Sequence, residues 1–163
     1  MGEIFNAEMV ISNETSNLAS MREFILANLL RTDLPRQEHG KIVLAVDEAV
    51  SNIMRHAYDN FAKGTRTIEI VLNVDEEKII FMLKDSGKEF DPTIIGDPNI
   101  LEHVKFGKRY GLGLFLMRRV MDEVKFVFRA GIENMLTMVK YIRASSGNAD
   151  GGNPGCNCAE DRG

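Results

Sequence analysis

The chain has 163 residues, of which 44% are hydrophobic and 27% charged, and its formal net charge is −4. This balance is typical of one globular domain with one core, and no apolar run is long enough to span a bilayer. Basic and acidic residues are intermixed, so no basic surplus marks a nucleic-acid groove. The first residues lack the charged-then-apolar pattern of a signal peptide. We therefore expect a cytoplasmic protein that binds neither membrane nor nucleic acid.

A strand and two helices are predicted over the first third of the chain. Residues 3–11 alternate apolar and polar side chains, which is typical of a half-buried strand. Thr15 or Ser16 is expected to cap a helix that ends before Pro35. A second helix is predicted from about 37 to 57, because apolar residues recur there at helical spacing. Its apolar positions are Ile42, Ala45, Val46, Ala49 and Ile53.

Two hairpins, separated by a long loop and a third helix, are predicted for the rest of the domain. Residues 86–110 show no period and are interrupted by prolines and glycines, and a loop of this length inside a compact domain is usually functional. Gly131 marks the turn of the second hairpin. The predicted segments are strands at 67–74 and 78–84, a helix at about 111–122, and strands at 124–129 and 135–142.

This order of elements predicts an α+β fold, a two-layer α/β sandwich with helices on one face of a mixed, mostly antiparallel sheet. Strand–helix alternation fails at both hairpins, which excludes a doubly wound nucleotide fold, and no Walker-type glycine–lysine loop is present. We expect one domain over residues 1–143 and a disordered tail over 144–163, because the tail has no apolar anchor. Cys156 and Cys158 in this tail are interpreted as free thiols, since their spacing strains a disulfide and a structural metal needs more ligands.

The second predicted helix carries three polar residues beside its apolar stripe. Glu48 and Asn52 are four residues apart, and His56 is one further step along the same face. An asparagine oxygen suits magnesium, which usually keeps waters and substrate phosphates as its other ligands. A carboxylate one turn earlier could accept a proton from an attacking hydroxyl or water. The alternative is a solvated helix face, which is favoured for any isolated Glu–Asn pair.

Asp85 ends a predicted strand, and Gly87 follows it in a tight turn. An ionised carboxylate only accepts hydrogen bonds, so Asp85 could bind an exocyclic amine such as that of adenine. Gly87 would let the ring approach the backbone closely. The alternative is a plain turn, because Asp-Ser-Gly is favourable turn chemistry, and it is favoured when this segment is considered alone.

A glycine-rich run opens the third predicted helix. Gly111 and Gly113 would leave backbone N–H groups accessible at a helix start, which forms an anion site. Lys108 and Arg109 come just before, where their charge could reach phosphate oxygens. The alternative is that the glycines only end the loop. Helical spacing assigns the apolar residues that follow to the core, namely Leu114, Phe115, Met117, Val120 and Met121.

The three segments in this order resemble the ATP-binding domain that gyrase, histidine kinases and the mismatch-repair ATPases share. The closer resemblance is to the anti-sigma-factor serine kinases of bacterial partner-switching systems. It rests on Glu48-Ala49-x-x-Asn52-x-x-x-His56-Ala57-Tyr58, Asp85-x-Gly87, Gly111-Leu112-Gly113-Leu114 and Met121-Asp122-Glu123-Val124. It covers nearly all of the chain up to Arg143, and the combination outweighs the separate alternatives. The resemblance implies a histidine-kinase-like ATP-binding fold that uses ATP and Mg²⁺.

The resemblance also implies a role for each matching residue. Glu48 would be the general base that activates a serine hydroxyl, and Arg109 would be a basic catalytic residue near the terminal phosphate. Asn52 would be the magnesium ligand. Asp85 would hold adenine, while His56 would either contact the ligand or support the structure. The nucleotide contacts implied are Asn52, His56, Asp85, Gly87, Lys108, Gly111, Leu112, Gly113, Leu114 and Thr137.

The chain departs from the family pattern where it enters its last strand. The family usually has a Gly-Thr pair there, whereas this chain reads Glu133-Asn134-Met135-Leu136-Thr137. Asn134 stands where glycine is usual, and whether Thr137 compensates is open. The departure affects contacts at the far side of the nucleotide and leaves the base and the metal ligand untouched.

The activity implied is that of a Mg-ATP-dependent serine/threonine protein kinase that acts as an anti-sigma factor and phosphorylates a STAS-fold anti-anti-sigma protein. An alternative sigma factor is the second implied partner, and members of this kind are commonly homodimers. The alternative function is a nucleotide-gated binding regulator with little or no kinase activity and no sigma-factor partner. Glu48 favours the kinase, because a pure binder need not keep it. A histidine-kinase fragment is disfavoured, since no phosphoacceptor helices precede the domain and His39, expected at the surface, is poorly placed.

Overall fold

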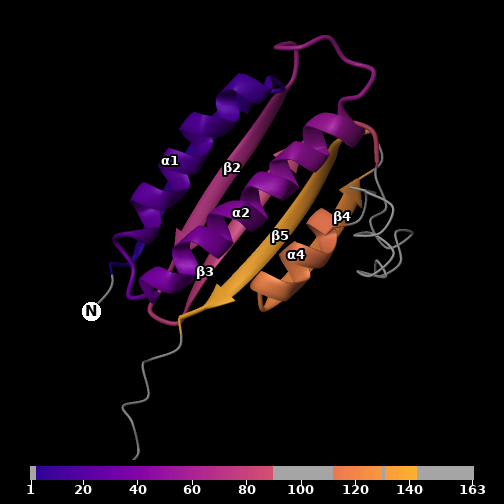
Figure 1. The fold of residues 1–163 in the computed structure, drawn as a ribbon. Helices are drawn as coiled ribbons and strands as arrows, with labels where there is room; N and C mark the ends of the chain where they lie inside the picture. Colours follow the sequence, from indigo (N-terminus) through magenta and orange to yellow (C-terminus); the bar gives the residue numbers. More distant parts are fainter. Residues whose placement is uncertain (1–2, 90–111, 130, 143–163) are drawn as a thin grey trace, which may run out of the picture.

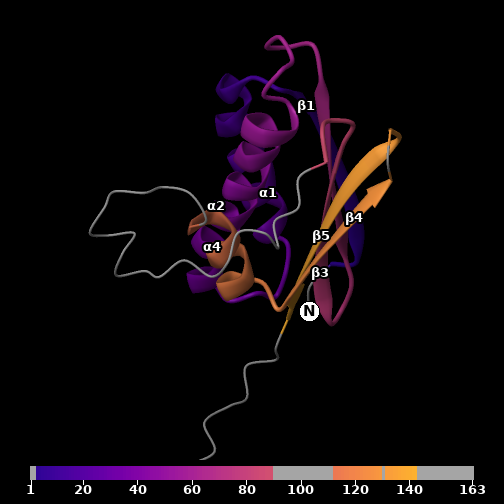
Figure 2. The same cartoon turned by 90° about the vertical axis from the view of Figure 1, so that its right-hand side faces the viewer.

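A computed structural model describes residues 3–89, 112–129 and 131–142 and arranges them in two layers (Figure 1). Within these ranges, three α-helices lie on one face of a five-stranded sheet, as the turned view in Figure 2 shows. The helical segments are η1 (Thr15–Asn17, a 3₁₀ turn), α1 (Leu18–Leu29), α2 (Arg36–Asn52), η2 (Ile53–Ala57, a π-helical turn) and α4 (Leu112–Val120). The strands are β1 (Phe5–Ser12), β2 (Thr67–Val74), β3 (Lys78–Asp85), β4 (Glu123–Arg129) and β5 (Glu133–Tyr141). The predicted α+β sandwich with helices on one face is confirmed.

The strands of the described chain pair in the order β1-β2-β3-β5-β4, and each neighbouring pair is antiparallel. The expected parallel component of the sheet is therefore not found among these strands. Both predicted hairpins, β2–β3 and β4–β5, are present. Because β5 lies beside β3, the register places Asn134 directly opposite Asp85. This pairing brings the start of the last strand to the end of the strand that carries the predicted base-recognition residue.

The core lies between the sheet and the helices, where α2 occupies the middle of the helical layer between α1 and α4 (Figure 1). Alternate residues of β2 and β3 are buried, as the period of two predicts. Fully burying an aliphatic or aromatic side chain contributes roughly 1.5–3 kcal/mol. The largest fully buried side chains are Tyr58, Phe81, Met21, Ile25, Leu29, Ile42, Ile68, Ile70, Leu72, Ile79, Leu83 and Met138. This packing fixes α2 in place, and its polar side then lies next to α4.

The helix boundaries differ from the sequence expectation at two places. Thr15 and Ser16 do not cap α1, because they form η1 and α1 begins only at Leu18. The second helix is not α-helical to its end, since its last turn widens into a π-helix in which the Tyr58 N–H donates to the Ile53 carbonyl at 3.1 Å. Single π turns are frequent at functional sites.

His39 is buried in α2, so the expectation that it lies at the surface is wrong. Its side chain is 5% exposed, and its Nε2 lies 3.0 Å from the Leu34 carbonyl oxygen. A carbonyl only accepts, so this ring nitrogen carries the proton and the histidine is satisfied inside the fold. Burial thus removes His39 from consideration as a phosphoacceptor.

Several expectations fall on residues outside the described ranges. These are the loop from 90 to 110, the domain boundary at 143 and the tail of 144–163 with its two cysteines. Within the described ranges, none of the helices has the length and apolarity that crossing a membrane requires.

Candidate functional site

Glu48 and Asn52 of α2 lie against the backbone of Gly113 in α4. Both side chains are half-buried, and a Cβ added to Gly113 would lie 2.8 Å from Glu48 Oε2 and 3.2 Å from Asn52 Nδ2. Only a residue without a Cβ leaves the Glu48 carboxylate in this position. The structure therefore brings together the predicted general base, the predicted metal ligand and one glycine of the predicted phosphate-binding run.

The first turn of α4 gives this place anion-binding character. The helix begins at Leu112, so Gly113 is its second residue. The first N–H groups of a helix have no partner within it, and a helix N-terminus attracts anions. The Glu48 carboxylate beside it would repel a phosphate unless a cation lies between them. Asn52 offers a neutral oxygen of the kind that Mg²⁺ accepts alongside phosphate and water, so the residues present fit a metal-bound polyphosphate.

The turn after β3 packs onto the end of η2 through Gly87. A Cβ on Gly87 would lie 2.5 Å from the Ala57 carbonyl oxygen and 2.7 Å from the Ala57 Cβ. The Lys88 N–H also donates to that carbonyl, at 2.9 Å. In the structure the group that approaches Gly87 closely is the backbone of Ala57, and the approach of a ligand ring to Gly87 stays a prediction. Glycine is thus required here by the fold itself.

Asp85 is buried at the end of β3, where two donors reach the same oxygen of its carboxylate. Its exposed fraction is 8%. The Gly87 N–H donates to Oδ1 at 2.8 Å, and the Asn134 side-chain amide donates to Oδ1 at 2.9 Å. Burial raises the pKa of the Asp85 carboxyl, and these two hydrogen bonds oppose the rise. Asp85 is therefore a desolvated acceptor with one carboxylate oxygen held by the protein.

Asn134 is a site residue whose role the sequence did not reveal. It is 7% exposed, and its amide also donates to the Gly87 carbonyl at 3.1 Å. It lies on the buried side of β5 together with Leu136 and Met138. The available signal was a polar residue at an inward position of β5 that is followed by the inward apolar residues Leu136 and Met138, because a buried polar group needs a specific partner.

Tyr58 holds the turn after β3 from the other side. Its hydroxyl donates to the Thr67 carbonyl at 2.8 Å and accepts from the Ser86 N–H at 3.0 Å. Its ring packs edge-to-face on Phe61, with centroids 5.7 Å apart. Tyr58 belongs to the motif recognised in the sequence, and the structure gives it a supporting role that joins the start of β2 to the Asp85 turn.

His56 lies in η2, half-buried, one residue before the Ala57 that contacts Gly87. Burial is the main cause that lowers its pKa, and the neighbouring charge of Arg55 adds to the effect. Lys88 lowers the pKa further, while Asp59 raises it. The lowered pKa favours the neutral imidazole, so we expect His56 to act as a hydrogen-bonding group and not as a cation.

Some predicted site residues lie away from the groups described above, and others fall outside the described residues. Thr137 pairs with Met82 and lies on the outer face of the sheet, whereas Asp85 and Asn134 lie on the helix-covered face. Leu114 is buried in the hydrophobic core, as helical spacing predicted, rather than exposed to a ligand. Lys108, Arg109 and Gly111 lie outside the described residues, as does the side chain of Leu112.

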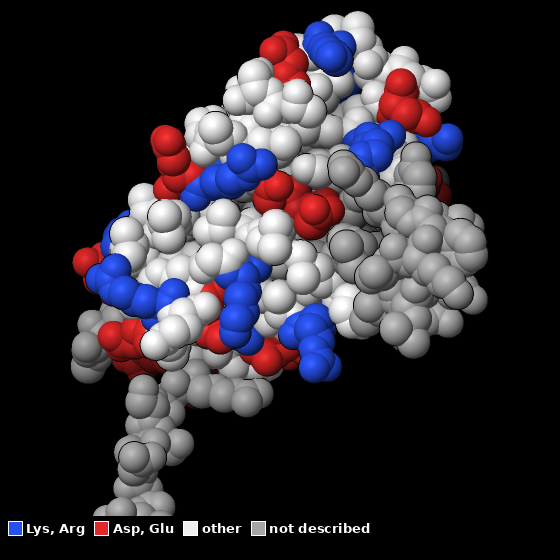
Figure 3. Space-filling model, viewed as in Figure 1, with Lys and Arg blue, Asp and Glu red and all other residues white. Residues whose placement is uncertain are grey.

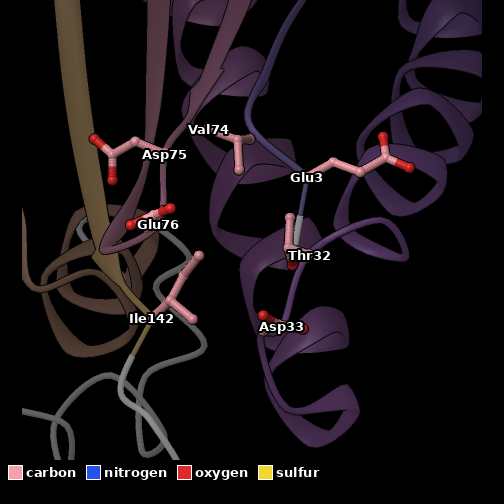
Figure 4. A pocket seen from close by; sticks show the side chains of 7 residues that line it. All are labelled: Glu3, Thr32, Asp33, Val74, Asp75, Glu76 and Ile142. Carbon is pink, nitrogen blue, oxygen red and sulfur yellow. The ribbon is translucent and has the colours of Figure 1, made fainter. Parts of the chain in front are cut away.

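A separate pocket of about 180 Å³ lies near the β2–β3 turn, at the opposite end of β3 from Asp85. Figure 4 shows its lining, which is Glu3, Thr32, Asp33, Val74, Asp75, Glu76 and Ile142. The Asp75 carboxylate already accepts from the N–H groups of Glu77 and Lys78, both at 2.8 Å.

In the described part of the chain, no three His, Cys, Asp or Glu side chains gather to hold a metal ion. A magnesium ion at Asn52 would thus depend on phosphate and water ligands.

Charges of both signs are interspersed over the helix-covered face (Figure 3). Arg22 is paired with Asp47 and Lys41 with Glu38, each at 2.7 Å. Exposed pairs of this kind contribute little to stability, but they neutralise the surface locally. The described part of this face therefore presents no broad field of one sign.

Known proteins with similar sequences include serine-protein kinases from staphylococci. The chain is 33% identical to "Serine-protein kinase RsbW" of Staphylococcus epidermidis and 36% identical to the protein of the same name from Staphylococcus aureus (strain bovine RF122 / ET3-1). Each match covers 104 residues, which are 61% of this chain and 64% of the relative. The chain thus spans slightly less than two thirds of the length of these relatives.

A solved structure and a family match agree with the described fold. The structure, "The crystal structure of the RsbU and RsbW domains of Rv1364c from Mycobacterium tuberculosis", aligns with a TM-score of 0.57 over 86% of this chain and 33% of that chain. At 15% identity, this likeness shows the fold alone. The family described as the histidine kinase-like ATPase domain matches residues 11–140. With most of its length matched, the chain belongs to the family of histidine kinase-like ATPase domains.

Proposed function

We propose that this protein is a Mg-ATP-dependent serine/threonine kinase that acts as an anti-sigma factor in a partner-switching system and phosphorylates a STAS-fold antagonist. The observation that carries the proposal is that Glu48 and Asn52 of α2 meet Gly113 of α4. This contact forms one end of a site that follows α2 and η2. Asp85 and its turn lie at the other end, against Ala57.

The arrangement suits an elongated nucleotide. Glu48 and Ala57 are nine positions apart along α2 and η2, so about two helical turns separate the two ends of the site. Asp85 would accept a hydrogen bond from the adenine amine, and the start of α4 would donate to the phosphates. Asn52 would hold Mg²⁺, which neutralises phosphate charge when it is bound. Each of these roles matches the chemistry of the side chain or backbone group in place.

Glu48 distinguishes a kinase from a nucleotide-binding regulator. A carboxylate beside the phosphate site could accept the proton of a serine or threonine hydroxyl as its oxygen attacks. Nucleotide binding alone needs no acceptor there, and an additional carboxylate weakens the binding of an anion. The name of the staphylococcal relatives, serine-protein kinase, supports the same reaction. The STAS-fold substrate, the sigma-factor partner, the homodimer and the cytoplasmic location are part of the proposal through the family resemblance.

The first test is capture of partners from a lysate of the native host on the tagged protein, in parallel with Mg-ATP and with Mg-ADP. Recovery of a sigma factor with ATP and of a STAS-fold protein with ADP is the expected result. The captured STAS-fold protein is then incubated with the purified kinase and ATP labelled at its γ-phosphate. Label on a serine or threonine of that protein supports the kinase. Partner affinities that differ between ATP and ADP without any transfer of label would replace the kinase by a nucleotide-gated regulator.

A further inference from the structure

Asn134 connects three parts of the site with one side chain. From β5 it donates 2.9 Å to Asp85 Oδ1 at the end of β3 and 3.1 Å to the Gly87 carbonyl in the turn that follows. Both partners are acceptors, so the amide nitrogen must face them and the flipped amide is excluded. The two N–H groups of the amide are thereby both used. Asn134 thus holds Asp85 and Gly87 in one fixed relation.

We propose that Asn134 is a positioning residue for base recognition, which holds Oδ1 of Asp85 so that Oδ2 is presented to the exocyclic amine of an adenine. This proposal rests on the proposed function, because it assumes that a nucleotide binds with its base at Asp85. Asn134 does not contact the ligand in this proposal and acts through Asp85.

The hydrogen-bonding capacity of the carboxylate supports this assignment. A carboxylate oxygen offers about two acceptor sites, and Oδ1 receives both the Gly87 N–H and the Asn134 amide. In the described chain, Oδ2 is therefore the oxygen left for a ligand donor. The Gly87 N–H and the Asn134 amide also fix the plane of the carboxylate. A ligand donor should approach Oδ2 close to this plane, because hydrogen bonds to carbonyl-type oxygens favour it.

The chemistry of an anchored, ionised aspartate selects the base. An ionised carboxylate accepts and cannot donate, so the ligand must present an N–H group. Adenine does so with its amine, whereas the carbonyl of guanine at the same ring position would face a second acceptor. The two donors to Oδ1 stabilise the charged form of the buried carboxyl, and without the Asn134 amide the carboxylate keeps the Gly87 N–H as a single anchor and can rotate. Removal of Asn134 should therefore reduce discrimination between bases more than it reduces binding of the phosphates.

The test compares ATP with purine riboside triphosphate, which lacks the exocyclic amine, by calorimetric titration in the presence of Mg²⁺. A hydrogen bond to a charged group is worth about 1.5–3 kcal/mol, so the wild-type protein should prefer ATP by roughly 10- to 100-fold. Asn134→Ala should reduce this preference to about threefold or less while binding of purine riboside triphosphate changes little. Asn28→Ala removes an amide of similar burial from α1, which donates to the Phe24 carbonyl at 2.8 Å, and should leave the preference unchanged.

Full preference for ATP in a folded Asn134→Ala protein would overturn the proposal. If that variant does not fold, side-chain amide NMR signals of wild-type Asn134 provide a second measurement. These signals should shift on binding of ATP and much less on binding of purine riboside triphosphate, and equal shifts would contradict the positioning role. A wild-type protein that binds both nucleotides equally would overturn the assignment of Asp85 as well. Preference for ATP without any phosphate transfer would leave this inference intact and remove only the kinase.

Discussion

The backbone of Gly113 in α4 packs directly against the Glu48 carboxylate of α2. A Cβ at Gly113 would lie only 2.8 Å from Glu48 Oε2. The atom that it would meet is the end of a flexible side chain, so an added methyl group can be accommodated if Glu48 moves. Position 113 therefore offers a way to displace the predicted base without replacing it.

We expect Gly113→Ala to reduce phosphate transfer while the fold persists. Alanine favours a helix over glycine by up to about 1 kcal/mol, so the melting temperature should stay level or rise. Displacement of a catalytic group by about 1 Å can reduce the rate roughly 100-fold. Single-turnover transfer and thermal unfolding of the same preparation check both parts. Wild-type transfer by the variant would show that the position of Glu48 is not critical.

Glu48→Gln should retain ATP binding and lose phosphate transfer. Glutamine keeps the size of the side chain but cannot take up the proton of the attacking hydroxyl at neutral pH, and general-base catalysis typically contributes about 100- to 10,000-fold. Calorimetric ATP binding and transfer of labelled phosphate are the measurements. Glu23→Gln, which changes an exposed carboxylate on α1, is the matched control. Transfer at the wild-type rate in Glu48→Gln would reject the base assignment.

Gly87→Ala should destabilise the whole domain, because its methyl group would collide with the Ala57 backbone at 2.5 Å. Overpacking of a site with little freedom to relax costs about 1–3 kcal/mol. Chemical denaturation would report this loss in the absence of any nucleotide. The exposed Gly131 has a φ of 72° but no atom near an added Cβ, so Gly131→Ala tests backbone strain without a collision. An unchanged free energy of unfolding in Gly87→Ala would contradict the close contact.

Asp85→Asn should stabilise the protein at neutral pH and abolish its preference for ATP. Burial holds the pKa of Asp85 above its ordinary value, so the folded protein binds the proton more tightly than the unfolded chain does. The resulting cost of ionisation is present in full above the raised pKa and disappears below the ordinary value of about 4. Asparagine keeps an oxygen for the Gly87 and Asn134 donors and carries no charge.

Melting temperatures of the wild type and Asp85→Asn across a pH series check this linkage. The difference should be largest near pH 7 and should shrink as the pH falls from the raised pKa toward the ordinary one. A difference that does not change with pH would show that the charge of Asp85 is not its cause.

Tyr58→Phe should weaken the Asp85 turn while it preserves the core. The ring remains buried against Phe61, but the Ser86 N–H and the Thr67 carbonyl lose their common partner. Ser86 and Thr67 lie at exposed positions, so the loss should be close to the net contribution of a hydrogen bond, about 0.5–1.5 kcal/mol. Hydrogen exchange at the Ser86 amide and the free energy of unfolding are the measurements. Tyr141→Phe, at an exposed tyrosine on β5, is the control. Unaltered exchange at Ser86 would exclude the supporting role.

Local sequence patterns determined much of the secondary structure of this protein and the shared helix face of Glu48 and Asn52. The period of two along the strands and the apolar stripe of the second helix predicted the elements, because both repeats follow from backbone geometry within one segment. The spacing of Glu48 and Asn52 predicted their shared face for the same reason. That face borders the core stripe, and the stripe is buried as expected, through Ile42, Ala45 and Ala49.

Tertiary structure alone decided which distant groups meet. Asn134 and Asp85 are 49 residues apart, and their contact depends on the pairing of β3 with β5, which no local pattern specifies. The reason for glycine at position 87 is the backbone of Ala57, which lies in the π-helical turn and packs against it from a distant part of the sequence. Thr137 is an intermediate case, because it is three positions after Asn134 and the period of two already places them on opposite faces of the strand. Register and packing are set by the whole chain at once, so the sequence supplied the functional groups and the fold decided which of them come together.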